Sequence, residues 1–186
     1  MVVDQREYLA CSDEIVGGLI ETVSTALFHD FPNVGVDLDD VEKVVAALTV
    51  LRPNVVEIET LTGLLHMFRG NWDDAMRVLR SVCERAPAFA YARTLLAVCL
   101  SANGDASWHR VASEALELEG DPHAAALVRV MRAREDLQGA IDAYQGGEEF
   151  RIPDSCAVLI AEQNATTEEN EVRAAGILDS SGYLRL

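Results

Sequence analysis

The chain has 186 residues and a formal net charge of −16 at pH 7, with 31 acidic residues against 15 lysines and arginines. This charge argues against nucleic acid as a partner, because the phosphates would be repelled, and it favours a basic or neutral partner. Hydrophobic residues make up 49% of the sequence, enough to fold one domain or one short solenoid around a buried core.

The N-terminal segment Met1–Glu7 lacks the basic start and long apolar stretch of a secretory signal. No apolar stretch approaches the ~20 residues that a membrane span requires. The four cysteines are widely spaced, without a Cys-x-x-Cys pair, which favours a reducing compartment over a disulfide scaffold. We therefore expect a cytoplasmic protein, and a periplasmic location stays open if the chain is exported without a signal peptide.

Two helices are predicted at the N-terminal end. The first begins with the cap residue Ser12 and reaches about His29, with apolar residues at helical spacing. A connection over residues 31–36 is longer than a repeat would need. The second helix runs from Asp39 to about Leu51, and acidic residues hold its start.

Residues 55–86 are predicted to form a hairpin of two helices joined by a turn at Gly70. The second helix stops before Pro87, because proline lacks the amide that a continuing helix needs. Small residues, Gly63 on the first helix and Ala75 on the second, indicate where the two helices approach closely.

The features of this hairpin recur at a fixed interval of about 34 residues, the length of a tetratricopeptide repeat. Gly104 follows Gly70 by this interval, and Ala97 follows Gly63 by the same interval. A fixed period of this length, with a small residue in the first helix and Gly at the turn, is typical of tetratricopeptide repeats. The sequence therefore predicts an all-α, tetratricopeptide-like helical-hairpin solenoid of three to four repeats. The alternative is a chance alignment of ordinary helical hairpins.

The later part of the chain is predicted to continue the repeats and then lose them. The third repeat begins with a helix from Ala90 to about Ala102. A degenerate fourth repeat runs to Pro153, with Ala140 and Tyr144 at its packing positions.

We expect two domains, a tetratricopeptide-like helical domain over residues 1–150 and a C-terminal tail over residues 151–186. The tail is expected to be partly disordered or packed as a cap. Its apolar segment Cys156–Ala161 is either a final packing turn or a short strand. The polar and acidic segment Asn164–Glu171 is expected to be mobile.

No spacing typical of a catalytic, cofactor or metal site occurs in the sequence. The four histidines lie on different predicted elements, and His66 occupies a position where repeats of this kind place a packed aromatic. Cys83 and Cys99 have no local basic partner that would activate a thiol. We expect no enzyme, no catalytic residue, no cofactor and no metal site.

A binding groove is the remaining functional prediction. In stacked helical hairpins the first helix of each repeat lines the concave face, where such solenoids usually bind. A mostly apolar groove suited to an amphipathic helix is predicted there, lined by Glu57, Thr60, Leu64, Met67, Phe68, Tyr91, Thr94 and Val98. Glu57 and Thr60 are expected at its rim. The alternative for Leu64, Phe68 and Val98 is that they fill the core or face a C-terminal element.

Three strings, Phe31–Asp40, Arg69–Ala75 and Glu84–Ala92, resemble the HrpB/HrpK family of bacterial type III secretion proteins. The resemblance covers roughly residues 12–120. It implies a small tetratricopeptide-like accessory protein of the secretion apparatus, without an assigned catalytic residue.

Two functions are compatible with this resemblance. The favoured hypothesis is a cytoplasmic chaperone or adaptor that shields an amphipathic helix of a secretion subunit, by analogy with tetratricopeptide-like type III chaperones. The second hypothesis is a structural assembly factor of the apparatus that acts in the periplasm, and an unexpected hydrolase is a distant third. The expected partner is a protein, a type III secretion subunit, and not nucleic acid. No membrane span is expected, and a homo-oligomer stays open.

Overall fold

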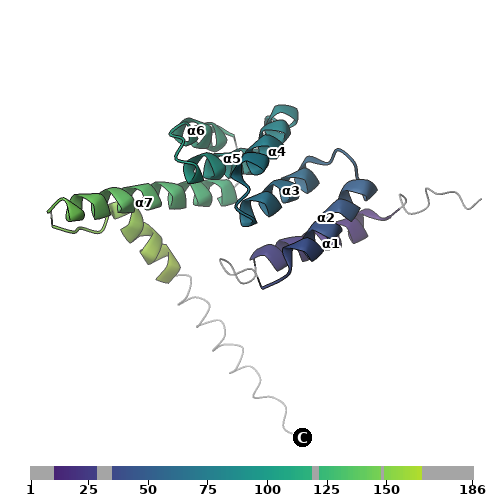
Figure 1. Cartoon of the computed structure of the whole chain (residues 1–186), viewed down its shortest axis with the longest axis horizontal. Coiled ribbons are helices and arrows are strands. Elements are labelled where there is room, and N and C mark those ends of the chain that lie inside the picture. Colours follow the sequence, from purple (N-terminus) through teal and green to yellow (C-terminus); the bar gives the residue numbers. More distant parts are fainter. Residues whose placement is uncertain (1–10, 29–34, 119–121, 148, 165–186) are drawn as a thin grey trace, which may run out of the picture. The chain divides into compact units, whose positions relative to one another are not determined.

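The computed structural model describes residues 11–28, 35–118, 122–147 and 149–164 (Figure 1). These residues form helices and contain no strand, so the all-α prediction is confirmed. The helices are α1 (Asp13–Phe28), α2 (Leu38–Leu51), α3 (Val56–Phe68), α4 (Trp72–Arg85), α5 (Ala90–Ala102), α6 (Trp108–Glu117), α7 (Pro122–Gln145) and a final helix over residues 154–164. Within these described residues, no helix has the length and apolar character to cross a membrane.

Some sequence-based predictions fall outside the described residues. These are the end of the first helix at His29, most of the connection over residues 31–36, and the acidic segment beyond Asn164. Elsewhere the observed bounds of α1, α2, α3, α4 and α5 lie within a residue or two of those predicted.

The structure groups into two compact units, Met1–Ala124 and Ala125–Leu186, so the division falls in the first turn of α7. This division differs from the boundary predicted at residue 150. Side-chain contacts explain the difference, because α7 is tied to the helix 154–164 that follows it. Ser155 Oγ donates to Asp136 Oδ2 at 2.6 Å, and Arg129 approaches Glu162 at 3.3 Å.

The hairpin of α3 and α4 has the close approach that its small residues predict. A Cβ added at Gly63 would lie 2.9 Å from Leu79 Cδ2, so a larger residue there would force the Leu79 side chain to move. Ala75, Leu79 and Val82 of α4 are fully buried. The side chain that Gly63 accommodates is therefore Leu79, one turn beyond Ala75.

Helix α5 is the most deeply buried element of the first unit. It packs against both α4 and α6, and eight of its 13 residues are buried: Ala90, Ala92, Thr94, Leu95, Leu96, Ala97, Cys99 and Leu100. On α6, Trp108 and Ala112 are also buried. This burial on two sides explains why α5 reads as hydrophobic almost throughout.

The same turn closes α3 and α5. Gly70 and Gly104 both have φ of +71°, the left-handed conformation that glycine adopts without strain. After α3, the amide of Gly70 donates to Met67 O and the amide of Asn71 to His66 O, a Schellman motif. After α5, the amide of Gly104 donates in the same way to Ser101 O. The recurrence in sequence is thus a recurrence of one backbone motif.

The prediction of a fourth repeat that runs to Pro153 is wrong. In place of a hairpin ending at Pro153, α7 is one helix of 24 residues. Between Pro122 and Gln145 there is no further proline, and the single Gly139 is not enough to end a helix. The next helix starts after Pro153, whose carbonyl accepts from the amides of Cys156 and Ala157. The segment Cys156–Ala161 is therefore helical, and the strand alternative is wrong.

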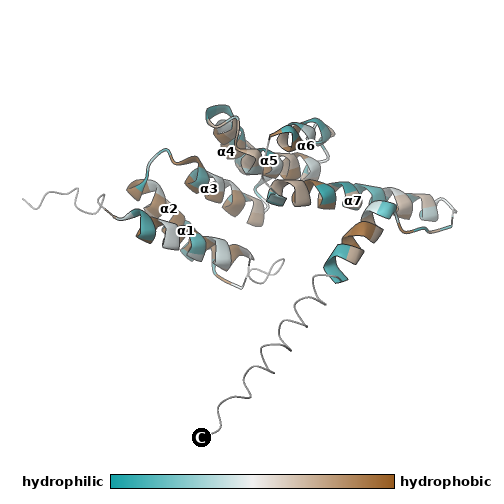
Figure 2. Ribbon diagram, turned by 180° about the vertical axis from the view of Figure 1, so that it is seen from behind, coloured by the Kyte–Doolittle hydropathy of each residue, from teal (hydrophilic) through white to brown (hydrophobic). Residues whose placement is uncertain are grey.

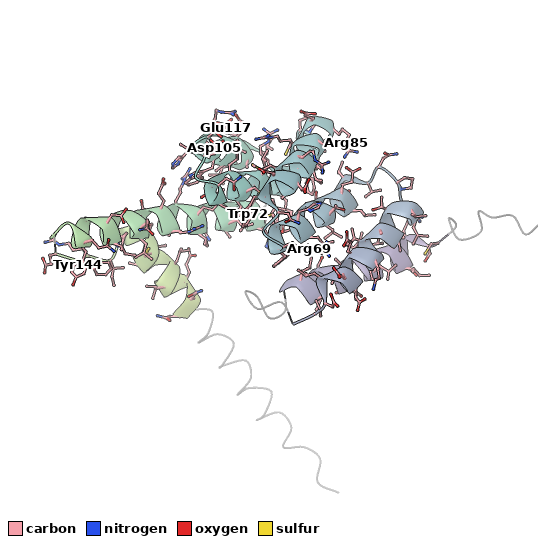
Figure 3. The ribbon with its side chains drawn as sticks, viewed as in Figure 1. Arg69, Trp72, Arg85, Asp105, Glu117 and Tyr144 are labelled. Carbon is pink, nitrogen blue, oxygen red and sulfur yellow. The ribbon has the colours of Figure 1, made fainter. Side chains whose placement is uncertain are left out.

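Arginines at helix ends pair with acidic residues of the preceding helix in the first unit, and Figure 3 labels two of them, Arg69 and Arg85. Each reaches an acidic residue near the start of the preceding helix: Arg52 pairs with Asp13, Arg69 with Asp39 and Glu42, and Arg85 with Glu59. Adjacent antiparallel helices place a C-terminal end beside an N-terminal end. Such pairs therefore complement both helix dipoles as well as each other's charge.

Candidate protein-binding surface

The predicted groove residues on α3 divide between core and surface. Glu57 is exposed, and Met67 and Phe68 are half-buried. Thr60 and Leu64 are only 3% and 4% exposed. The rim position predicted for Thr60 is therefore wrong. Helix α3 packs against both α2 and α4, so its buried face is wider than a single amphipathic stripe.

The equivalent residues on α5 divide in the same way. Tyr91 and Val98 are half-buried, whereas Thr94 is fully buried. The hydroxyl of Thr94 donates to Ala90 O at 3.0 Å, and that of Thr60 donates to Val56 O at 2.8 Å. Both threonines thus satisfy their polar groups within their own helix, which allows them to lie in the core.

Five of the predicted groove residues have side chains that are at least partly exposed. They are Glu57, Met67, Phe68, Tyr91 and Val98, which we call the α3–α5 surface. Helices α3 and α5 contact each other, so these residues come from neighbouring elements. The ring of Tyr91 lies 6.4 Å from that of Phe89, a residue that the sequence-based prediction did not include. Four of the five residues are apolar or aromatic, and the fifth is acidic.

The two thiols considered for chemistry are poor nucleophiles. Burial raises the pKa of Cys99 to about 12, and it also raises the pKa of Cys83 above its ordinary value. A raised pKa keeps both thiols largely protonated near neutral pH. Since the thiolate is the reactive form, both react poorly as nucleophiles. All four cysteines are free thiols.

His66 lies at a small, partly open cavity of mixed polar and apolar lining between α2 and α3. The cavity has a volume of about 120 Å³ and is also lined by Glu42, Thr62 and Arg69. Among the described residues, His66 Nδ1 is buried and has no hydrogen-bond partner. Within the described ranges, no group of three or more His, Cys, Asp or Glu side chains could hold a metal ion.

A second surface, which the sequence-based reasoning missed, lies in the second unit. It is an open groove of about 950 Å³ between α7 and the helix 154–164, here called the C-terminal groove. Its lining residues are Ala126, Arg129, Val130, Ala133, Arg134, Leu137, Cys156, Leu159, Ile160, Glu162, Gln163 and Asn164. Figure 2 shows the hydrophobic stretch of the final helix in brown. The sequence feature that could have indicated this groove is the spacing of Ala126, Val130, Ala133 and Leu137, which places them on one helical face.

The sequence matches one family model, described as bacterial type III secretion protein (HrpB1_HrpK), over residues 6–137. The chain belongs to this family. The resemblance found in the sequence is thereby confirmed, and the match extends beyond residues 12–120 at both ends. Neither the curated proteins nor the solved structures contain a match to this HrpB1/HrpK family member.

The HrpB1/HrpK match covers the two surfaces unequally. It includes the whole α3–α5 surface. In the C-terminal groove it includes the α7 wall as far as Leu137, and it leaves out the helix 154–164. The α3–α5 surface thus belongs to the part of the chain that defines the family, whereas one wall of the C-terminal groove does not.

Proposed function

We propose that this type III secretion protein is a non-enzymatic chaperone or adaptor that binds an amphipathic helix of a secretion-apparatus subunit. The supporting observation is the set of partly exposed apolar side chains on two neighbouring helices, within the residues that match the family. The proposed place of action is the cytoplasm, before the subunit is assembled.

The chemistry of the α3–α5 surface suits a helical ligand. Methionine adapts its shape to different partners, and Met67 lies beside Phe68 at the end of α3. Tyr91 combines apolar area with a polar tip, a property that favours interfaces. Glu57 and the net charge of −16 favour a partner helix flanked by Arg or Lys.

We also propose that the α3–α4 and α5–α6 hairpins are tetratricopeptide-like repeats. Their first helices begin at Val56 and Ala90, which are separated by the same interval as the two turn glycines. Their turns share one hydrogen-bonded motif around Gly70 and Gly104. Repeats of this kind present their first helices to ligands, which supports binding on α3 and α5.

The test is the double variant Met67→Glu with Tyr91→Ala, measured by thermal melting and by pull-down of individually expressed secretion subunits. We expect binding to be lost while the melting temperature stays close to that of the wild type, because both side chains are partly exposed. Val50→Glu on α2, where the native side chain is 57% exposed, controls for an added surface charge.

If the folded double variant captures the subunit as well as the wild type does, the binding site lies elsewhere. Fractionation of the native cell separates the two roles. A soluble cytoplasmic pool supports the chaperone, and a periplasmic pool would favour the structural assembly factor instead.

A further inference from the structure

The C-terminal groove leaves apolar side chains of two helices open to solvent. Val130 is 51% exposed, Leu137 37% and Ile160 50%. These side chains line one groove with Leu159 and Cys156, so they form a patch rather than scattered single residues. Contiguous exposed apolar side chains are a feature of ligand-binding grooves, whereas single scattered ones are ordinary on soluble proteins.

The direction of the two walls shows where the chain leaves the groove. Asp136 and Ser155 meet near one end, and Arg129 and Glu162 near the other. The helix 154–164 therefore runs antiparallel to α7. Its last residue, Asn164, lines the groove at the end near Ala126 and Arg129.

The groove carries positive charge on an otherwise acidic protein. Arg129 and Arg134 line it from α7. Arg129 pairs with Glu162, whereas Arg134 makes no ion pair or hydrogen bond within the part of the chain that the structure describes. An unpaired guanidinium beside apolar side chains favours a ligand that is apolar along one side and acidic beside it.

A segment with acidic and apolar residues follows directly after Asn164 in the sequence. Residues 165–186 carry Glu168, Glu169 and Glu171, followed by Ile177 and Leu178. From Ala126 to Leu137 the α7 wall spans about 16 Å at 1.5 Å per residue. The 22 residues after Asn164 would span about 33 Å even as a helix, which is enough to reverse direction and run the length of the groove.

We propose that residues 165–186 bind in the C-terminal groove of their own chain, with their acidic residues at Arg134 and Ile177 and Leu178 against Val130 and Leu137. A tethered segment has an effective concentration in the millimolar range, which a second copy or a separate protein does not reach at ordinary concentrations. The segment thereby covers the groove, and any other ligand of this surface has to displace it.

Cys156 provides the readout, because its thiol lines the groove. Iodoacetamide labelling of the full chain, followed by mass spectrometry of each cysteine peptide, measures its alkylation rate. Cys11 and Cys83, which lie in the other unit, are references in the same molecule. In the variant Ile177→Asp with Leu178→Asp we expect Cys156 to react about tenfold faster than in the wild type. This factor corresponds to a wild-type groove that is covered about nine-tenths of the time and a variant groove that stays open.

Matched variants control for charge and for folding. Ser180→Asp with Ser181→Asp adds the same charge to the segment without removing apolar side chains, and we expect the wild-type rate. Arg134→Glu should also accelerate Cys156. Arg132→Glu should not, because Arg132 lies on α7 outside the groove and likewise has no partner within the described residues.

The alkylation rates of Cys156 also test whether a different ligand covers the groove. If the wild type and the Ile177→Asp, Leu178→Asp variant react equally, the segment does not cover the groove and the proposal is wrong. If protection of Cys156 rises with protein concentration, a second copy covers the groove instead. A synthetic peptide of residues 165–186, added to the full-length variant, should slow Cys156 alkylation again, and failure to do so would equally contradict the proposal.

Discussion

Gly70 and Gly104 set the backbone in the turns that join the two helices of the α3–α4 and α5–α6 hairpins. Each has φ of +71°, and nothing lies within 4 Å of the Cβ position at either residue. A side chain at these positions would therefore meet backbone strain but no clash. The requirement for glycine comes from the turn alone, and so it is visible in the sequence.

Gly70→Ala should lower the free energy of unfolding by about 1 kcal/mol, since a non-glycine residue is disfavoured in the left-handed region. Gly18→Ala is the matched control. Gly18 lies inside α1 with open space at its Cβ position, so alanine there should stabilise by up to about 1 kcal/mol. Urea denaturation followed by circular dichroism measures both. Equal shifts of the same sign would contradict the assigned turn.

Burial of single polar residues was harder to predict than the turns. Thr60 and Thr94 occupy equivalent positions of the two hairpins, and both are in the core. A threonine can be buried at little cost when its hydroxyl bonds the carbonyl four residues earlier, as both do. Sequence periodicity cannot distinguish this arrangement from a hydroxyl at a groove rim.

At the scale of helices, the pattern of apolar residues predicted α1 to α5 well, and it failed for α7. The first hairpins carry turn glycines, prolines and cap residues at their boundaries, which are local signals. Helix α7 and the helix 154–164 were misjudged because the expected repeat period suggested a turn that α7 lacks. The C-terminal groove was missed for the same reason, since one of its walls was assigned to a tail.

Ala75→Leu should destabilise the α3–α4 hairpin by about 1–3 kcal/mol through overpacking. Ala75 is fully buried on α4, and α4 already approaches α3 closely at Gly63. Ala47→Leu, on an exposed position of α2, is the control and should change stability by less than about 0.5 kcal/mol. Thermal melting compares the two variants. An unchanged melting temperature for Ala75→Leu would mean that the packing register of α4 is wrong.

At the scale of the whole molecule, we expect stability to depend on stacking between hairpins. Helix α5 buries residues against α4 on one side and α6 on the other, so no hairpin carries a complete core by itself. This dependence between neighbours is expected of repeat architectures. The family was also evident in the sequence, because two of its strings, Arg69–Ala75 and Glu84–Ala92, lie in turns and helix starts with characteristic residues.

Far-ultraviolet circular dichroism of the full chain should show dominant helix. An isolated peptide of residues 55–86 should be largely unfolded, because helices of 13 and 14 residues are marginal in water without their neighbours. A strand-rich spectrum of the full chain would overturn the fold, and a fully helical 55–86 peptide would contradict the dependence on stacking.

The sparse packing of α1 has a consequence for how the chain opens. Only Val16, Val23 and Leu27 of its 16 residues belong to the buried core, against eight of 13 in α5. The free energy of local opening follows such burial, so α1 should detach and return many times before α5 unfolds once. Each detachment uncovers part of the buried face of α2. The N-terminal end therefore offers a transient hydrophobic surface that appears without unfolding of the other hairpins.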